Sequence, residues 1–159
     1  DSTWFGLKMY MGGYEEVYDK KLTSLQKCKK LHIACLKNSR IIAYAKTSEG
    51  TVHDNNYFED AIRTMINNGI NVTELIADAG YSSKLNYKLC QELGIEEVYI
   101  DFRENAKQRE APSNYREQLE MLRNKPEKWH EKYRYRVLVE GIFSAVKRKR
   151  GFLSRTGLS

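Results

Sequence analysis

Short apolar runs separated by polar turns fill the first part of the chain, a pattern typical of strands and hairpins. An opening strand is predicted at residues 3–7. Two further β-type runs, at residues 31–36 and 41–45, are separated by residues 37–40, which have hairpin length and turn chemistry. The chain is therefore expected to begin as an antiparallel meander.

Between residues 55 and 100 the pattern becomes an alternation of helix and strand. A helix from about Asn55 to Asn67 is predicted by apolar residues at helical spacing, namely Phe58, Ala61, Ile62, Met65 and Ile66. A strand at residues 73–78, a helix capped by Ser82 or Ser83 that ends at Gly94, and a strand at residues 97–100 follow. These βαβ-type units after a meander predict an α/β fold with a mixed sheet flanked by helices.

The last third of the chain is more polar. Residues 101–132 contain Pro112 and Pro126 and are expected to form a polar excursion before a final helix from about Tyr133 to Arg150. This last third also holds the excess positive charge, because residues 101–159 carry 15 basic and 8 acidic side chains. A basic block beside a near-neutral core favours a polyanion such as nucleic acid, although a solubilising tail has the same composition.

Length and composition limit the class of protein further. A chain of 159 residues forms one domain of ordinary size, and it contains no apolar run of about 20 residues that would span a bilayer. Its odd number of cysteines, 3, favours reduced thiols over a disulfide framework. We therefore expect a cytoplasmic protein.

The final helix carries the clearest candidate site. Tyr133, Arg136 and Lys147 project within about 40° of Glu140 around an ideal helix axis, so four side chains share one stripe. A charged stripe is more often only the solvated face of an amphipathic helix. Gly141 weakens a helix, so its position beside Glu140 suggests a need for close approach.

The order of these residue types resembles a known family. The spacing Tyr133-x2-Arg136-x3-Glu140-x6-Lys147 is similar to the tyrosine–arginine–glutamate–lysine signature of DDE transposases from bacterial and archaeal insertion sequences. Asp1-Ser2-Thr3 resembles the first catalytic aspartate block of that family and residues 75–81, which contain Asp78, resemble the second. Residues 30–32 and His53-Asp54 resemble accompanying blocks.

This resemblance implies a ribonuclease H-like fold and a metal-dependent enzyme that cleaves and joins DNA strands. Asp1, Asp78 and Glu140 would hold two Mg²⁺ or Mn²⁺ ions, which prefer carboxylate oxygens. Arg136 and Lys147 would bind phosphates, and Tyr133 would stack on a base or bond a phosphate. The run Lys147, Arg148, Lys149 and Arg150 would continue the DNA-binding surface.

The resemblance also implies partners, and it leaves alternatives open. The partners would be double-stranded DNA, namely transposon ends and target, and a second copy of the chain in a synaptic complex, associated with the nucleoid when bound. An N-terminal DNA-binding part is expected to be absent from this chain. The alternatives are a related nuclease without strand transfer and an inactive DNA-binding module. For Asp54 a helix N-cap is favoured over a functional role, and for Trp129 a rim or core position is favoured over base flipping.

Overall fold

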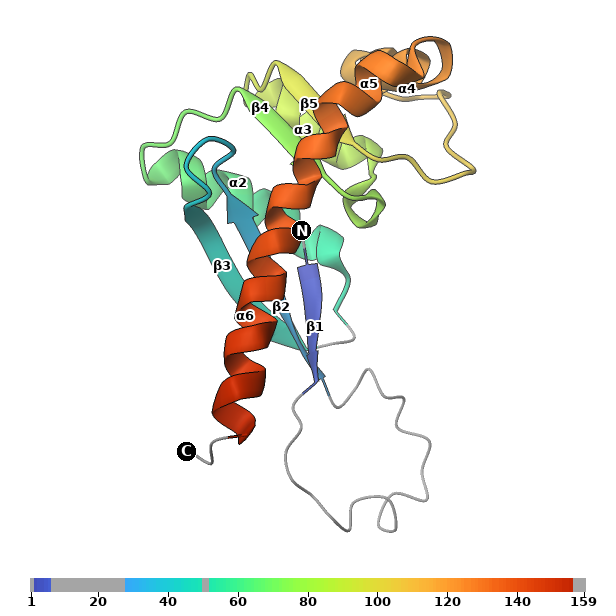
Figure 1. Ribbon diagram of the computed structural model, residues 1–159. Helices are drawn as coiled ribbons and strands as arrows, with labels where there is room; N and C mark the ends of the chain where they lie inside the picture. The colour runs from blue at the N-terminus through green and yellow to red at the C-terminus, as the bar shows by residue number, and fades with distance from the viewer. Residues whose placement is uncertain (1, 7–27, 50–51, 156–159) are drawn as a thin grey trace, which may run out of the picture.

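The computed structural model describes residues 2–6, 28–49 and 52–155, and Figure 1 shows its two groups of strands with helices around them. Strands β1 (Ser2–Gly6), β2 (Cys28–Cys35) and β3 (Ile42–Glu49) form an antiparallel sheet in that order. The register pairs Ser2 with His32 and Ala34 with Tyr44. The predicted meander and its hairpin at residues 37–40 are therefore confirmed.

The second sheet is parallel and, in the part of the chain that the structure describes, pairs β4 (Glu74–Ala77) with β5 (Glu97–Ile100). Helix α3 (Lys84–Glu92) makes the crossover between these strands. The side chain of Ser83 accepts a hydrogen bond from the Leu85 amide, so Ser83 is the cap of α3. Gly94 ends this helix in the left-handed region, with φ of 71°, as its sequence position predicted.

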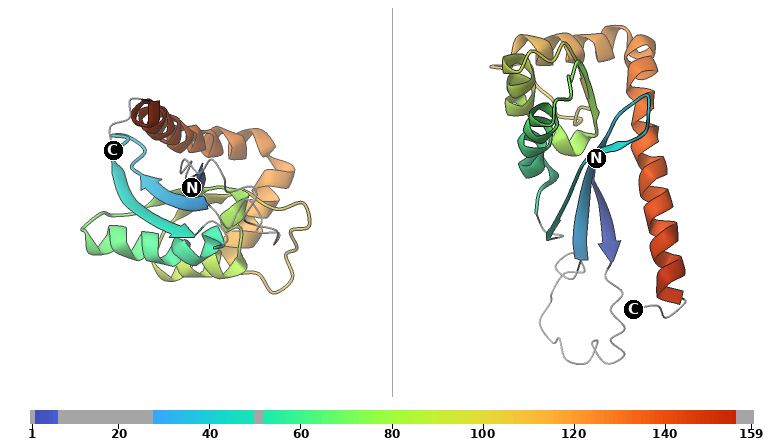
Figure 2. Two further views of the ribbon diagram at one scale, coloured as in Figure 1. Left: turned by 90° about the horizontal axis from the view of Figure 1, so that it is seen from below. Right: turned by 90° about the vertical axis from the view of Figure 1, so that its left-hand side faces the viewer.

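The predicted first helix begins with a tighter turn. A 3₁₀ segment, η2 (Asp54–Tyr57), leads into α2 (Phe58–Asn67), which buries Phe58, Ile62 and Met65. Helix α2 lies on one face of the antiparallel sheet and the final helix lies on the opposite face (Figure 2). A second 3₁₀ turn, η3 (Ala79–Tyr81), follows β4 and leads toward α3.

The polar excursion at residues 101–132 contains two helices that the sequence analysis did not predict. They are α4 (Ser113–Asn124) and α5 (Pro126–Tyr133). Tyr115 and Leu119 are four residues apart and are buried on one side of α4. Pro126 occupies the first turn of α5, where a backbone N–H would have no partner within the helix. The many polar and charged residues of this stretch made the helical spacing of its few apolar residues hard to recognise.

The final helix also differs from the prediction. Tyr133 ends α5, the 3₁₀ turn η4 (Arg134–Arg136) follows, and α6 runs from Val137 to Arg155. The signature residues are therefore divided among three consecutive helical segments. Of the basic run at residues 147–150, the structure describes only the side chain of Arg148, and that side chain is exposed.

The strands do not join into the single mixed sheet that the sequence predicted. Among the described residues, β4 pairs with β5 alone, and a cavity of about 620 Å³ lies between the two sheets, lined by β2, α2, β4 and the start of α6. The Lys37 ammonium crosses the gap to Glu74 Oε2 at 2.7 Å. The α/β class is confirmed, with one antiparallel and one parallel sheet.

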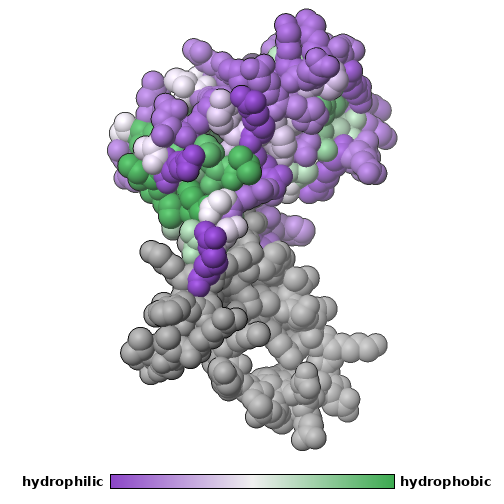
Figure 3. Space-filling model, in the orientation of Figure 1, coloured by the Kyte–Doolittle hydropathy of each residue, from purple (hydrophilic) through white to green (hydrophobic). Residues whose placement is uncertain are grey.

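The main core joins the two sheets through aromatic and aliphatic side chains. Its fully buried members include Ile62, Tyr87, Cys90 and Ile100. Cys90 lies on α3 and is a core residue. On the outer surface, Figure 3 shows apolar area near the tip of the β2–β3 hairpin, where Ile41 is 60% exposed.

Candidate active site

Asp78 lies where β4 ends, at the start of the turn η3. Its Oδ1 accepts a hydrogen bond from the Gly80 amide at 2.8 Å, so the carboxylate caps the turn. Among the hydrogen bonds of the described residues, this is the one that Asp78 makes with its side chain. Asp78 therefore has a local structural role, and its Oδ2 is the oxygen available for another ligand.

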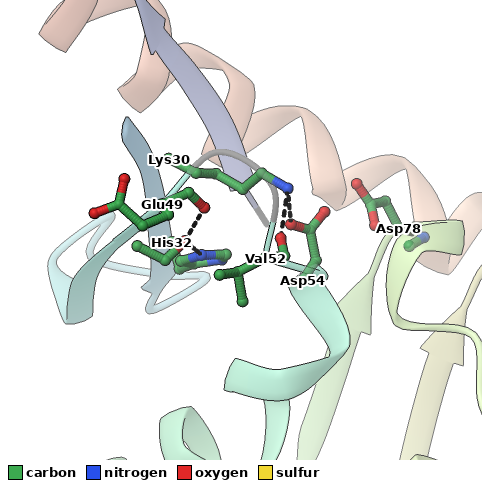
Figure 4. Close-up of polar contacts among 8 residues, drawn as sticks. Lys30, His32, Glu49, Val52, Asp54 and Asp78 are labelled. Atoms are coloured by element: carbon green, nitrogen blue, oxygen red, sulfur yellow. Dashed lines mark hydrogen bonds and ion pairs between the residues drawn. The ribbon is translucent and has the colours of Figure 1, made fainter. Parts of the chain in front are cut away.

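A second carboxylate lies beside Asp78 across Gly80. A Cβ built on Gly80 would be 2.9 Å from Asp78 Oδ1 and 3.2 Å from Asp54 Oδ2. Figure 4 shows the two carboxylates directed toward each other. The close approach of both side chains requires that residue 80 have no Cβ.

Asp54 is fixed by a buried lysine. The Lys30 ammonium donates to Asp54 Oδ1 at 2.8 Å and to the Val52 carbonyl at 3.0 Å, and its side chain is 7% exposed (Figure 4). The interpretation of Asp54 as a helix N-cap is wrong, because η2 begins at Asp54 itself and its N-cap residue is His53. His53 is exposed at this turn, as expected of a loop residue.

Tyr133, Arg136 and Glu140 form one connected group. Arg136 Nη1 donates to the Tyr133 hydroxyl at 3.3 Å, and Arg136 Nη2 donates to Glu140 Oε1. The Tyr133 ring stacks on Trp129 with centroids 4.6 Å apart, and Trp129 is fully buried. Trp129 is thus a core residue that supports the aromatic member of the group.

The pKa values relate this group to Asp78. Burial raises the pKa of Tyr133, and the carboxylates of Asp101 and Asp78 raise it further, against the effect of Arg136. Burial alone would lower the pKa of Arg136, but its bond to Tyr133 and the charges of Glu140 and Asp78 raise it. Asp78 is therefore within electrostatic range of the Tyr133–Arg136 pair, although the two come from distant parts of the sequence.

Other predicted site residues lie elsewhere or outside the description. Asp1 is not among the described residues, and neither are the side chains of Lys147, Lys149 and Arg150. The Glu140 side chain is 52% exposed. A Cβ on Gly141 would meet no described atom within 4 Å, so the close approach expected there is not made by the described part of the chain.

The structure brings two residues to the site that are not among the catalytic residues predicted from the sequence, Lys30 and Asp54. Their signal was present, because both belong to the accompanying blocks at residues 30–32 and His53-Asp54. Spacing alone assigned neither of them a partner, because they are 24 residues apart and come from different elements.

The donor chemistry of the site suits a divalent cation, since hard ions such as Mg²⁺ take carboxylate oxygens. Asp78 offers its Oδ2, while its Oδ1 accepts the hydrogen bond from the Gly80 amide. Glu140 lies in the first turn of α6. No group of three or more potential metal ligands occurs among the described residues, which do not include Asp1.

These contacts define the class of protein. It is an α/β domain in which Asp78, at the end of a strand, lies within electrostatic range of Tyr133 and Arg136, and Arg136 bonds to Glu140. The family is more specific. The family model described as transposase DDE domain matches residues 12–158, and the chain belongs to this family. No curated protein and no solved structure matched the chain. Within the part of the chain that the structure describes, no helix is long and apolar enough to cross a membrane.

Proposed function

We propose that this chain is the ribonuclease H-like catalytic domain of an insertion-sequence transposase, which cleaves DNA strands and transfers them to a target. Membership of the DDE family gives the reaction class. The observation that supports the site is the electrostatic proximity of Asp78 to Tyr133 and Arg136, the latter bonded to Glu140.

Asp78 and Glu140, with Asp1, are the proposed ligands of two Mg²⁺ or Mn²⁺ ions. When bound, such a pair of ions activates the attacking oxygen and stabilises the leaving oxygen of a phosphodiester. Asp78 is oriented for this role by the Gly80 amide, which holds Oδ1 and leaves Oδ2 for the ion. Cation binding also offsets the repulsion among neighbouring carboxylates.

Arg136 has two tasks in this proposal. Its guanidinium fixes the Glu140 carboxylate from one turn away and keeps the Tyr133 hydroxyl in reach, so the three side chains act as a unit. A planar guanidinium can also bind a phosphate oxygen of the DNA backbone. Lys147, two helical turns beyond Glu140, and the basic residues Arg148, Lys149 and Arg150 would extend contact along the same DNA.

The experiment is Mn²⁺-dependent nicking of supercoiled plasmid by the wild-type protein and by Asp78→Asn and Glu140→Gln. Both variants are expected to lose nicking by at least about 100-fold while DNA binding at equal salt changes less than about threefold, because the ligands are removed and the phosphate contacts remain. Asp60→Asn is the matched control, since Asp60 pairs with Lys46 on the α2 side of the sheet.

Unchanged nicking by Asp78→Asn would refute the assignment of the site. DNA binding without nicking in the wild type would favour the inactive module. Nicking without joined products, when ends and target are supplied together, would favour a nuclease. Joined products that carry both DNAs are the expected result.

A further inference from the structure

Lys30 is a buried cation that the proposed reaction does not yet use. It lies near the start of β2, and its ammonium donates to the Val52 carbonyl and to Asp54, the first residue of η2. A lysine is rarely buried unless its charge is paired. One buried cation thus fixes the short segment from which the Asp54 carboxylate projects.

A buried amide ties the same segment to the turn that follows Asp78. Asn86 Nδ2 donates to Asn55 Oδ1 at 2.6 Å and to the Tyr81 carbonyl at 2.8 Å, and Asn86 is 6% exposed. The rings of Phe58 and Tyr81 also lie together, with centroids 5.8 Å apart. The turns η2 and η3 are therefore held against each other by both polar and apolar contacts.

The result is a fixed pair of carboxylates. Asp54 Oδ2 and Asp78 Oδ1 both lie within 3.2 Å of one point, the place that a Cβ on Gly80 would occupy. Lys30 binds the other oxygen of Asp54, Oδ1 (Figure 4). Two negatively charged carboxylates this close to one point repel each other, so the surrounding structure must hold them in place.

We propose that Asp54 is a positioning residue for Asp78 and that Lys30 holds it in this role. The Asp54 charge disfavours rotation of the Asp78 carboxylate toward η2, and it increases the attraction of Asp78 for a divalent cation. Lys30 offsets enough of the repulsion for both side chains to coexist in the fold. This inference rests on the proposed function, because it concerns cation binding at Asp78.

The test is direct Mn²⁺ binding, followed by the electron paramagnetic resonance signal of free Mn²⁺ at pH 7 without DNA. Asp54→Asn keeps an oxygen for Lys30 and removes the charge beside Asp78. It is expected to raise the Mn²⁺ dissociation constant about tenfold. This is less than the full Coulomb attraction between one unit charge and a nearby cation. Asp78→Asn is expected to abolish this binding.

Asp60→Asn is the control for removing an aspartate from a lysine pair, because Asp60 accepts from Lys46 at 2.9 Å and from Tyr44 at 2.6 Å on another side of the fold. It is expected to leave the Mn²⁺ dissociation constant unchanged. The double variant Lys30→Met with Asp54→Asn removes both charges together, so no uncompensated buried charge destabilises it. It is expected to bind Mn²⁺ more weakly than the wild type but less weakly than Asp54→Asn, because it also lacks the Lys30 charge, which repels the cation.

The outcomes separate the two proposals. Wild-type protein that binds no Mn²⁺, or Asp78→Asn that binds it normally, would overturn the proposed site and this inference with it. Loss of binding in Asp78→Asn together with wild-type affinity in either variant lacking the Asp54 charge would overturn the inference alone. Urea unfolding of each variant in the same buffer establishes that the binding constants are those of folded protein.

Discussion

Gly80→Ala tests the geometry on which the candidate site depends. Gly80 is not among the described glycines with positive φ, so an alanine meets no backbone strain there. The added Cβ would be 2.9 Å from Asp78 Oδ1, closer than real Cβ contacts, and 3.2 Å from Asp54 Oδ2. Both carboxylates must therefore move by a few tenths of an ångström, away from the Gly80 amide.

The magnitude follows from the bond that this shift weakens. A hydrogen bond to a charged group contributes about 1.5–3 kcal/mol to the free energy of unfolding. Alanine also restricts the unfolded chain more than glycine does, which stabilises the folded protein by about 0.4–1 kcal/mol. We expect a net destabilisation of about 1 kcal/mol. A displacement of about 1 Å can cost about 100-fold in rate, so a shift of a few tenths of an ångström should reduce nicking by about three- to tenfold.

Urea unfolding measures the first effect and Mn²⁺-dependent plasmid nicking measures the second. Gly141→Ala is the matched substitution, because a Cβ there meets no described atom within 4 Å. It should stabilise α6 by about 0.5–1 kcal/mol. Gly80→Ala with wild-type stability and wild-type nicking would refute the placement of Asp54 and Asp78.

Three further predictions concern other parts of the molecule. Burial lowers the pKa of His32 to about 4, so the stabilisation by neutral His32 is complete above pH 6.5 and is lost as the pH falls toward 4. Between these pH values, the free energy of unfolding in urea should therefore change less in His32→Gln than in the wild type, by at most about 3 kcal/mol. An identical pH profile for the two proteins would contradict this. Trp129→Ala should destabilise the fold by about 3–5 kcal/mol, since Trp129 is fully buried between Tyr133 and Tyr99, and a loss below 1 kcal/mol in the same assay would place Trp129 outside the core. Arg136→Ala with Lys147→Ala should reduce the slope of log K against log salt for DNA by about 2, and an unaltered slope would assign both to a solvated face.

Local features of the fold could be predicted because they depend on near neighbours in the chain. The hairpin at residues 37–40, the Ser83 cap and the Gly94 stop each follow from a few adjacent side chains. The helices α4 and α5 were missed, although Tyr115 and Leu119 carried a weak helical spacing, because charged residues dominate that stretch.

The candidate site was predictable only in its parts. The order of Tyr133, Arg136 and Glu140 in the sequence indicated that they act together, and contacts one turn apart connect them in the structure. Their proximity to Asp78 could not be calculated from spacing, because it depends on how η4 packs against β4.

The sequence by itself determined the meander, the helix–strand alternation of residues 55–100 and the family of this protein. The tertiary structure alone decided that the described strands pair as two sheets, and that Lys30 is buried against Asp54. The physical reason is range: helix caps, turns and periodic faces are set by residues a few positions apart. The position of a charge beside Asp78 is set by packing and burial between segments 24 residues or more distant, which no local pattern encodes.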